Sequence, residues 1–242
     1  MKAGIELQKA VKKFGDKIAV DGLSISVSPG EIFGLLGPNG AGKTTSLKML
    51  SGLMKPDQGR ARICGIDIHR EPEKAKAQLG YIPDDPFIYE LLTGREFLRL
   101  VANIFKLPKS EIEPKINQLA ETFDAGKWLD LRTESYSHGM RQKVVIAAAM
   151  LHDPCVYLID EPMFGLDPAS MIIVRNIFKQ EAAKGKALLI STHVLSLAEM
   201  VCHRIGIITN GRLVVLGTLD ELRSLSQKKH KNLEDLYLEF TT

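Results

Sequence analysis

The segment Gly37–Thr44 constrains this chain more than any other part of its sequence. It reads Gly-Pro-Asn-Gly-Ala-Gly-Lys-Thr and matches the pattern G-x-x-x-x-G-K-S/T at every fixed position. Glycines let consecutive backbone N–H groups curl around phosphate oxygens, Lys43 places a positive charge on the β- and γ-phosphates, and the Thr44 hydroxyl suits Mg²⁺. The sequence therefore predicts a phosphate-binding loop, and the candidate binding residues are Gly37, Pro38, Asn39, Gly40, Ala41, Gly42, Lys43, Thr44 and Thr45.

The residues around this loop predict the strand and the helix that such a loop needs. Ile32–Leu36 is an apolar run that favours a buried strand, and Thr45–Leu50 favours a helix. The N-terminus of that helix would face the bound anion. Few chance matches to the pattern lie at a connection from a strand to a helix.

Composition and charge restrict the class of protein. The 242 residues are 45% hydrophobic and 25% charged, which is typical of a soluble globular chain. The net charge of +3 is too small to indicate nucleic-acid binding by itself. No stretch approaches the roughly 18 apolar residues that span a bilayer, and Met1–Ala10 shows no signal peptide. Any membrane role is therefore expected to depend on a partner.

The order of the expected elements indicates an α/β chain with a helical insertion. Residues 5–63 favour mostly strands, and helical spacing dominates from about 84 to 152, where Thr93 and Glu96 form a capping-box pattern. Strands and helices alternate after residue 153. We expect a single domain over 1–242, divided into an α/β core at about 1–83 and 153–230, a helical subdomain at about 84–152 and a C-terminal amphipathic helix at about 231–242.

A second motif places two carboxylates at the end of an apolar strand. Val156–Ile159 predicts a buried strand, and Asp160 and Glu161 follow it. A Mg²⁺-dependent nucleoside triphosphatase needs this arrangement, because Asp160 can hold the metal through its water shell and Glu161 can orient and deprotonate the attacking water. An ordinary acidic turn is the alternative, and the phosphate-binding loop upstream makes it the weaker one.

Just before that strand, residues 136–142 read Tyr-Ser-His-Gly-Met-Arg-Gln, and here the chain resembles the ATP-binding cassette ATPases, the nucleotide-binding subunits of ABC transporters. The resemblance covers nearly the whole chain and rests on motifs in the family's order. They are Phe14 (the aromatic that stacks on adenine), Gly37–Thr44 (Walker A), Asp84 (Q-loop), Ser137–Gln142 (signature), Tyr157–Asp160 with Glu161 (Walker B and catalytic carboxylate), Gly165–Asp167 (D-loop) and His193 (switch histidine).

This resemblance implies a fold and a mechanism. The implied fold is an α/β P-loop NTPase core with an antiparallel β-subdomain and a helical insertion that carries the signature. Two cassettes, identical or different, would associate head to tail on binding ATP, with each ATP between the Walker A loop of one and the signature of the other. Ser137 and the Gly139 N–H would contact the γ-phosphate, and His193 would hold the attacking water with Glu161.

The implied cofactors are ATP and Mg²⁺, with Thr44, Asp84 and Asp160 as the metal-side residues. The family's Q-loop position normally holds Gln. A carboxylate can still ligate Mg²⁺ or its water, but it cannot donate a hydrogen bond as an amide does. Asp85 is the alternative at this position, and Asp84 is preferred because it directly follows the Tyr-Ile-Pro strand end.

The signature also departs from the family pattern, which has two successive glycines followed by Gln. Here His138 and Met140 flank a single glycine, so that Ser137 and Gly139 retain the phosphate-donor geometry. We expect the His138 side chain to point outward as a surface group. The alternative is a pH-sensitive charge near the interface between cassettes.

The variant motifs and the C-terminal tail resemble the exporter branch of drug, polysaccharide, bacteriocin and Ecs-type systems. In that branch a separate transmembrane permease subunit is the partner, so the cassette is expected at the cytoplasmic face of the cell membrane, as a peripheral protein. Leu233, Leu236, Tyr237 and Phe240 recur at helical spacing, and we expect this helix to pack on its own domain rather than on a partner.

Other classes of cassette remain as alternatives. An importer subunit is the closest, although the chain ends about 25 residues after Leu216, without the long regulatory domain typical of importers. A cassette acting on DNA is disfavoured because no heptad run lies between the Walker A loop and the signature, and one acting on ribosomes would usually carry two cassettes. No nucleic-acid partner is therefore expected. A cassette that clamps ATP without hydrolysis is disfavoured because Glu161 and His193 are both present.

Overall fold

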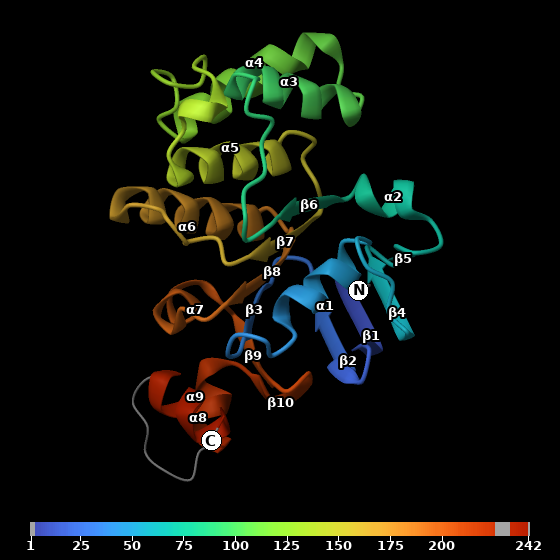
Figure 1. The fold of residues 1–242 in the computed structure, drawn as a ribbon. Helices are drawn as coiled ribbons and strands as arrows, with labels where there is room; N and C mark the ends of the chain where they lie inside the picture. Colours follow the sequence, from blue (N-terminus) through green and yellow to red (C-terminus); the bar gives the residue numbers. More distant parts are fainter. Residues whose placement is uncertain (1–2, 226–232, 242) are drawn as a thin grey trace.

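The computed structural model describes residues 3–225 and 233–241, and its centre is a six-stranded sheet (Figure 1). The strand order is β10-β9-β3-β8-β7-β6; β10 runs antiparallel to β9 and the other pairs are parallel. The strands are β3 (Ile32–Leu36), β6 (Leu79–Ile82), β7 (Val156–Asp160), β8 (Ala187–Thr192), β9 (Arg204–Thr209) and β10 (Arg212–Gly217). Every residue of β3, β7 and β8 is buried, as expected for parallel strands covered on both faces. Their carboxyl ends meet at one edge, where the sequence motifs follow.

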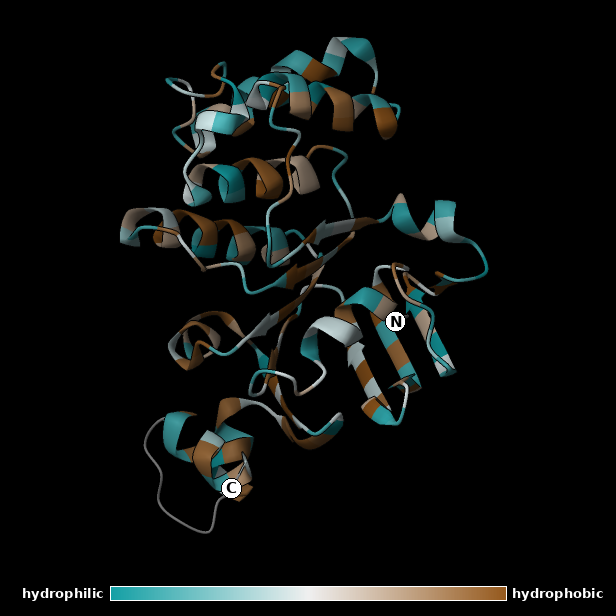
Figure 2. Ribbon diagram, in the orientation of Figure 1, coloured by the Kyte–Doolittle hydropathy of each residue, from teal (hydrophilic) through white to brown (hydrophobic). Residues whose placement is uncertain are grey.

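A second sheet is antiparallel and has the strand order β2-β1-β4-β5. Its strands are β1 (Ile5–Phe14), β2 (Lys17–Val27), β4 (Gln58–Ile63) and β5 (Ile66–Asp67). Buried and more exposed residues alternate along β1 and β2, which Figure 2 shows as bands of opposite hydropathy. The buried face packs on the core sheet and on α1 (Lys43–Leu50). The expected α/β fold with an antiparallel β-subdomain is confirmed.

Helices α3 (Gly94–Ile104), α4 (Lys109–Thr122) and α5 (His138–Met150) lie together, away from the antiparallel sheet (Figure 1). The predicted capping box is present, because the Thr93 side chain accepts from the Glu96 N–H and the Glu96 carboxylate accepts from the Thr93 N–H. Helix α5 begins at His138, where Ser137 caps it. A 3-10 turn at Thr133–Ser135 also belongs to this half, whereas the short helix α2 (Pro72–Lys76) lies against β4, β5 and β6.

Helix α6 (Pro168–Ala183) is an element that the sequence prediction lacked. Its start carries two ordinary signals: the Asp167 side chain accepts from the Ser170 N–H, and Pro168 occupies the first turn. Its buried residues share an apolar cluster with α5, and the two helices are drawn side by side in Figure 1. This packing joins the helical half to the core sheet.

The last elements are α7 (Leu195–Val201), α8 (Leu219–Leu225) and α9 (Leu233–Thr241). Leu233 and Leu236 of α9 are fully buried against residues of β9, α7 and α8, so the predicted packing of the tail on its own domain is confirmed. Residues 226–232 and 242, where the predicted limits of the tail helix fall, lie outside the described residues. Within the described ranges, no helix combines the length and the apolar character needed to cross a bilayer.

Candidate functional site

The phosphate-binding loop connects β3 to α1, so the amino end of α1 and its free N–H groups face the loop. Two of its glycines are required by the close approach of neighbouring backbone. A Cβ on Gly37 would lie 2.3 Å from the carbonyl oxygen of Ile208, and a Cβ on Gly42 would lie 2.5 Å from that of Ala19. Gly42 also has φ 108°, in the left-handed region. The loop conformation therefore excludes a side chain at both positions.

Lys43 opens α1, and its buried ammonium group is held inside the loop. Its Nζ donates to the carbonyl oxygen of Gly37 at 2.7 Å and lies 3.8 Å from a carboxylate oxygen of Glu161. Burial lowers the pKa of Lys43, and the negative charges of Glu161 and Asp160 oppose that shift. The result is a partly desolvated cation, which attracts an anion more strongly than a cation in water does.

Asp160 ends β7 and is fully buried, with the hydroxyl of Ser191 donating to its carboxylate and the Thr44 side chain also within reach. Burial raises the pKa of Asp160; the Ser191 and Thr44 hydroxyls oppose this, while the carboxylates of Asp84 and Glu161 add to it. Its Oδ2 atom is buried and has no hydrogen-bond partner among the described residues. An unpartnered carboxylate oxygen of Asp160 near the Thr44 hydroxyl offers oxygen donors of the kind that Mg²⁺ prefers, although no three His, Cys, Asp or Glu side chains of the described residues form a cluster that could hold a metal ion.

Glu161 and His193 meet because β7 and β8 are adjacent parallel strands and each residue follows the end of its strand. Nδ1 of His193 lies 2.9 Å from one carboxylate oxygen of Glu161. The other oxygen accepts from the Thr192 hydroxyl at 3.1 Å and from the His193 backbone N–H at 3.3 Å. The Glu161 side chain is 18% exposed and that of His193 is 55% exposed. This carboxylate is thus oriented by several contacts and still reachable by water.

A pocket of ≈ 340 Å³ at the loop gathers many of the predicted nucleotide residues. Its lining residues are Phe14, Lys17, Ala19, Asn39, Gly40, Gly42, Lys43, Thr44, Thr45, Asp84 and Glu161. Phe14 is 49% exposed, which leaves ring surface open for a flat partner. Asp84 lines this pocket, whereas Asp85 lines a separate one. The position of Asp84 therefore agrees with the preferred alignment.

Lys17 and Ala19 are pocket residues that sequence reasoning missed. A signal was available, because residues 14–17 read Phe-Gly-Asp-Lys, and a two-residue turn that contains glycine favours a hairpin. In the structure Phe14 pairs with Lys17 across this turn. The hairpin places a lysine opposite the aromatic residue, at the rim of the pocket.

The signature lies elsewhere in the chain. Ser137 and Gly139 do not line the pocket that contains Lys43. Ser137 accepts from the Met140 N–H at 3.3 Å as the cap of α5. The expected outward orientation of His138 is wrong, because its ring packs edge to face on Phe164 and its Nε2 atom is buried. The edge of one ring meets the face of the other, a favourable aromatic arrangement that explains the inward orientation of His138.

A parallel sheet with a phosphate-binding loop after β3, acidic residues at the end of β7 and a histidine after β8 defines a P-loop nucleoside triphosphatase. The chain belongs to the ABC transporter family, whose profile matches residues 20–164. It is 39% identical over 215 residues to Nod factor export ATP-binding protein I of Paraburkholderia xenovorans (strain LB400), covering 89% of this chain and 71% of the relative. It is also 39% identical over 219 residues to the ABC-type transporter ATP-binding protein EcsA of Bacillus subtilis (strain 168), covering 90% and 89%.

Solved structures agree with this assignment. One, described as the ATP-binding subunit of an ABC transporter, matches with a TM-score of 0.93 at 36% identity, covering 98% of this chain and 99% of that one. A second, a dimeric post-hydrolysis state of an ATP-binding cassette bound to ADP and Pi, has a TM-score of 0.81 at 23% identity, covering 89% and 98%, and shows the shared fold. The chain is therefore an ATP-binding subunit of the ABC transporter class, and an ATPase.

Proposed function

We propose that this chain binds ATP with Mg²⁺ and hydrolyses it to drive export through a separate membrane subunit. The observation that carries the proposal is the Glu161 carboxylate, 2.9 Å from Nδ1 of His193 and 3.8 Å from Nζ of Lys43. A base between a histidine and the lysine of a phosphate loop is placed where water would attack a γ-phosphate. The name of one relative, a Nod factor export protein, supports the exporter branch.

Different residues of the chain have different roles in hydrolysis. Lys43 and the loop N–H groups bind the β- and γ-phosphates, and Phe14 stacks on the adenine. Glu161 orients the attacking water and accepts its proton, while His193 holds Glu161 and contacts the γ-phosphate. The contacts of Glu161 with Thr192 and His193 support this division, because they fix its carboxylate before the nucleotide arrives.

The metal-side residues in this proposal are Thr44, Asp160 and Asp84. Thr44 and Asp160 would hold Mg²⁺, Asp160 through the water shell of the metal, and Asp84 would add a carboxylate on the same side. When bound, Mg²⁺ neutralises charge on the β- and γ-phosphate oxygens. The raised pKa of the buried Asp160, due first to burial, supports the fit, because a cation beside this carboxylate would offset the cost of its buried charge.

A complete site needs a second cassette, identical or related. Ser137 and Gly139 lie at the amino end of α5, where free N–H groups and the helix dipole attract an anion, yet they do not line this chain's own pocket. We infer that they contact the γ-phosphate bound by the opposing cassette, and that ATP holds the two copies together. The solved cassette that is dimeric supports this arrangement.

Glu161→Gln tests the proposed base. The amide keeps the shape of the side chain but cannot accept the proton, so we expect hydrolysis to slow by about 10²- to 10⁴-fold. ATP binding should persist, and an ATP-bound dimer should accumulate on size-exclusion chromatography. Hydrolysis at nearly the parental rate would show that another group is the base.

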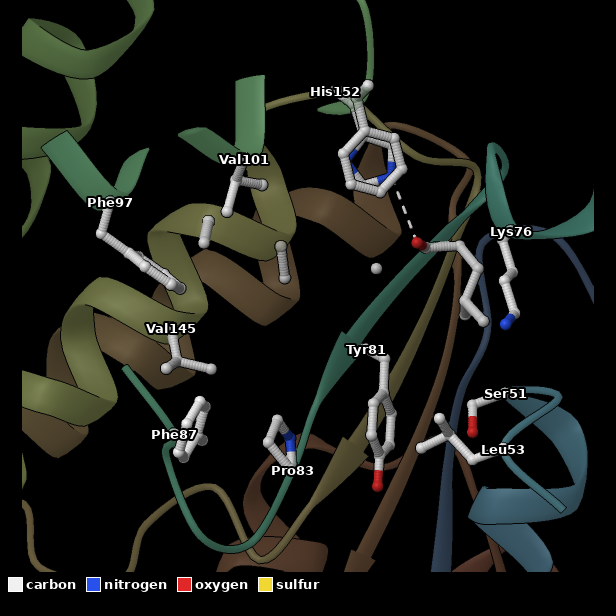
Figure 3. Close-up of a pocket in the computed structure, with 15 residues that line it drawn as sticks. Ser51, Leu53, Lys76, Tyr81, Pro83, Phe87, Phe97, Val101, Val145 and His152 are labelled. Carbon is white, nitrogen blue, oxygen red and sulfur yellow. Dashed lines mark hydrogen bonds between the residues drawn. The ribbon is translucent and has the colours of Figure 1, made fainter. Parts of the chain in front are cut away.

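The membrane subunit is proposed to dock beside the helical half of the chain. A groove of ≈ 650 Å³, called the docking groove here, is lined by Asp85, Pro86, Phe87, Ile88, Tyr89, Glu90, Leu91, Leu92 and Arg141. Phe87 and Leu91 are 74% and 75% exposed. Phe87 also lines a neighbouring apolar pocket, where Figure 3 shows it beside Val145, with Tyr81 and Pro83 on the side of β6.

Apolar side chains interspersed with two carboxylates fit an amphipathic helix that carries Lys or Arg. Glu90 already faces Arg141 at 3.4 Å, so the more available acid is Asp85. Such a helix would come from the cytoplasmic side of the membrane subunit. This chain would then lie at the cytoplasmic face of the membrane, as a peripheral protein.

Asp85→Lys tests this docking. We expect the reversed charge to weaken co-purification with the membrane subunit by about tenfold or more, because like charges at an interface cost several kcal/mol. Glu121→Lys, the same reversal of charge at an exposed position on α4, is the control. Unchanged co-purification and unchanged stimulation of ATPase activity by the membrane subunit would rule out the docking groove.

A further inference from the structure

His138 and Phe164 join two motifs that are far apart in the sequence. The two rings meet edge to face, with centroids 5.4 Å apart and an interplanar angle of 88°. The same imidazole lies against Gly165, where an added Cβ would come within 2.3 Å of Cδ2 of His138. The buried Nε2 of His138 has no hydrogen-bond partner within the described residues. Packing against the ring and the glycine therefore holds this side chain in place.

Other residues at the start of α5 also contact the segment around Phe164. An added Cβ on Gly139 would lie 3.1 Å from the carbonyl oxygen of Gly165. Gln142 is buried, and its Nε2 donates to the carbonyl oxygen of Pro162 in a long hydrogen bond of 3.5 Å. Leu166 is buried in the apolar cluster that contains α5. The start of α5 and residues 161–167, called the base segment here, therefore form one packed unit.

We propose that His138 is a positioning residue that couples the signature of this chain to its own base segment. The inference rests on the proposed function, in which Ser137 contacts ATP of the opposing cassette and Glu161 serves ATP of its own. One packed unit then carries groups for two different ATP sites. A shift of α5 on meeting the opposing γ-phosphate would be passed through the His138–Phe164 contact to the segment that begins with Glu161.

Substitutions at the contact between the two rings are expected to lower the rate of hydrolysis modestly. A pair of aromatic rings in this geometry contributes enough to change a rate by about 2- to 10-fold. We expect His138→Ala and Phe164→Ala each to slow hydrolysis by such a factor, and the double variant to be no slower than either one. His138→Phe should retain the parental rate because a ring still faces Phe164. Binding of ATP to the monomeric chain should stay unchanged in all of these variants, since neither residue lines the pocket at the phosphate-binding loop.

A mixed dimer separates this role from that of an ordinary signature residue. One subunit carries His138→Ala and its normal Glu161, and the other carries Glu161→Gln and a normal signature. The active site is then the one built from the first subunit's Glu161 and the second subunit's intact signature. Single-turnover hydrolysis of radiolabelled ATP is compared with that of the same dimer containing unsubstituted His138. We expect a decrease of about 2- to 10-fold, since His138 acts on the base of its own chain.

An unchanged rate in this mixed dimer would overturn the inference, because His138 would then serve the opposing site alone. Strictly multiplicative effects of His138→Ala and Phe164→Ala would also overturn it. Ile104→Ala is the control for Phe164→Ala, since the two side chains are 66% and 67% exposed, and it should leave hydrolysis unchanged. A parental chain that neither binds ATP nor dimerises on it overturns the proposed function as well. If the parental chain hydrolyses ATP normally and His138→Ala hydrolyses it at the same rate, this inference fails while the proposed function stands.

Discussion

The side chain of Lys186 offers a sharp test of how this core holds a buried charge. The Lys186 and Glu181 side chains are 11% and 4% exposed, and Nζ lies 2.5 Å from the carboxylate. Lys184 and the Tyr157 hydroxyl contact the same carboxylate at 2.6 Å and 3.1 Å. Lys186→Met keeps most of the apolar stem and removes the ammonium group, so Glu181 stays buried with fewer partners.

The size of the loss follows from what remains around Glu181. Removing one partner of a buried ion pair costs about 3–5 kcal/mol, because the other charge is left uncompensated. Lys184 and Tyr157 still contact Glu181 in the variant, although Lys184 is 62% exposed and therefore screened by water. We expect the free energy of unfolding at pH 7 to fall by about 2–3 kcal/mol. For a chain of this length that corresponds to a decrease of about 4–12 °C in Tm.

The loss of stability in Lys186→Met should also become smaller as the pH falls. Burial favours a higher pKa for Glu181, but hydrogen bonds from Lys184 and Lys186 outweigh it, so the pKa lies below its ordinary value. A carboxylate of this kind stabilises the fold above its unfolded pKa of about 4.3, and the contribution is lost as pH falls through the folded pKa. In Lys186→Met the pKa of Glu181 rises, so protonation of Glu181 at low pH removes the uncompensated buried charge. The difference in stability between parent and variant should therefore shrink from pH 7 to pH 4.

Urea unfolding at pH 7, 5.5 and 4 measures both expectations. Lys184→Met is the matched control, because it removes the exposed ammonium group from the same carboxylate and should cost about 0–1 kcal/mol. A loss in Lys186→Met no larger than that of the control would refute the reasoning. A difference that grows on acidification would refute it as well.

Two further substitutions test the loop and the helical half. Lys43→Ala should weaken ATP binding by about 10- to 100-fold, measured by calorimetry, because it removes charge-assisted contacts with phosphate; Lys48→Ala on the same helix is the control, and undiminished affinity in Lys43→Ala would contradict the loop assignment. Thr93→Ala should lower the free energy of unfolding by about 1 kcal/mol, since it removes the cap of α3. Thr122→Ala, at the C-terminal end of α4, is the control and should lower it less. Equal losses of stability in the two variants would argue against the cap.

The sequence was most informative where the structural requirement is local. The loop Gly37–Thr44 is specified by the spacing of its glycines, and the capping box of α3 by residues three positions apart. Helix α6 also carried local signals, Asp167 and Pro168 at its start, and these were overlooked. The orientation of His138 is different, because it depends on the base segment folding back against α5, a contact that no spacing within either motif specifies.

The backbone of Glu161 explains why a contact at His138 can reach the proposed base. Glu161 has φ 44°, a conformation that costs about 1–3 kcal/mol and persists only where the surroundings fix it. Its N–H donates to the carbonyl oxygen of Ser191 at 3.0 Å, while Gln142 of α5 holds the carbonyl oxygen of Pro162. β8 therefore fixes this strained residue directly, and α5 contacts the residue that follows it. Loosening the start of α5 at His138 weakens one of these supports, so we expect kcat to fall while the Kd for ATP stays the same.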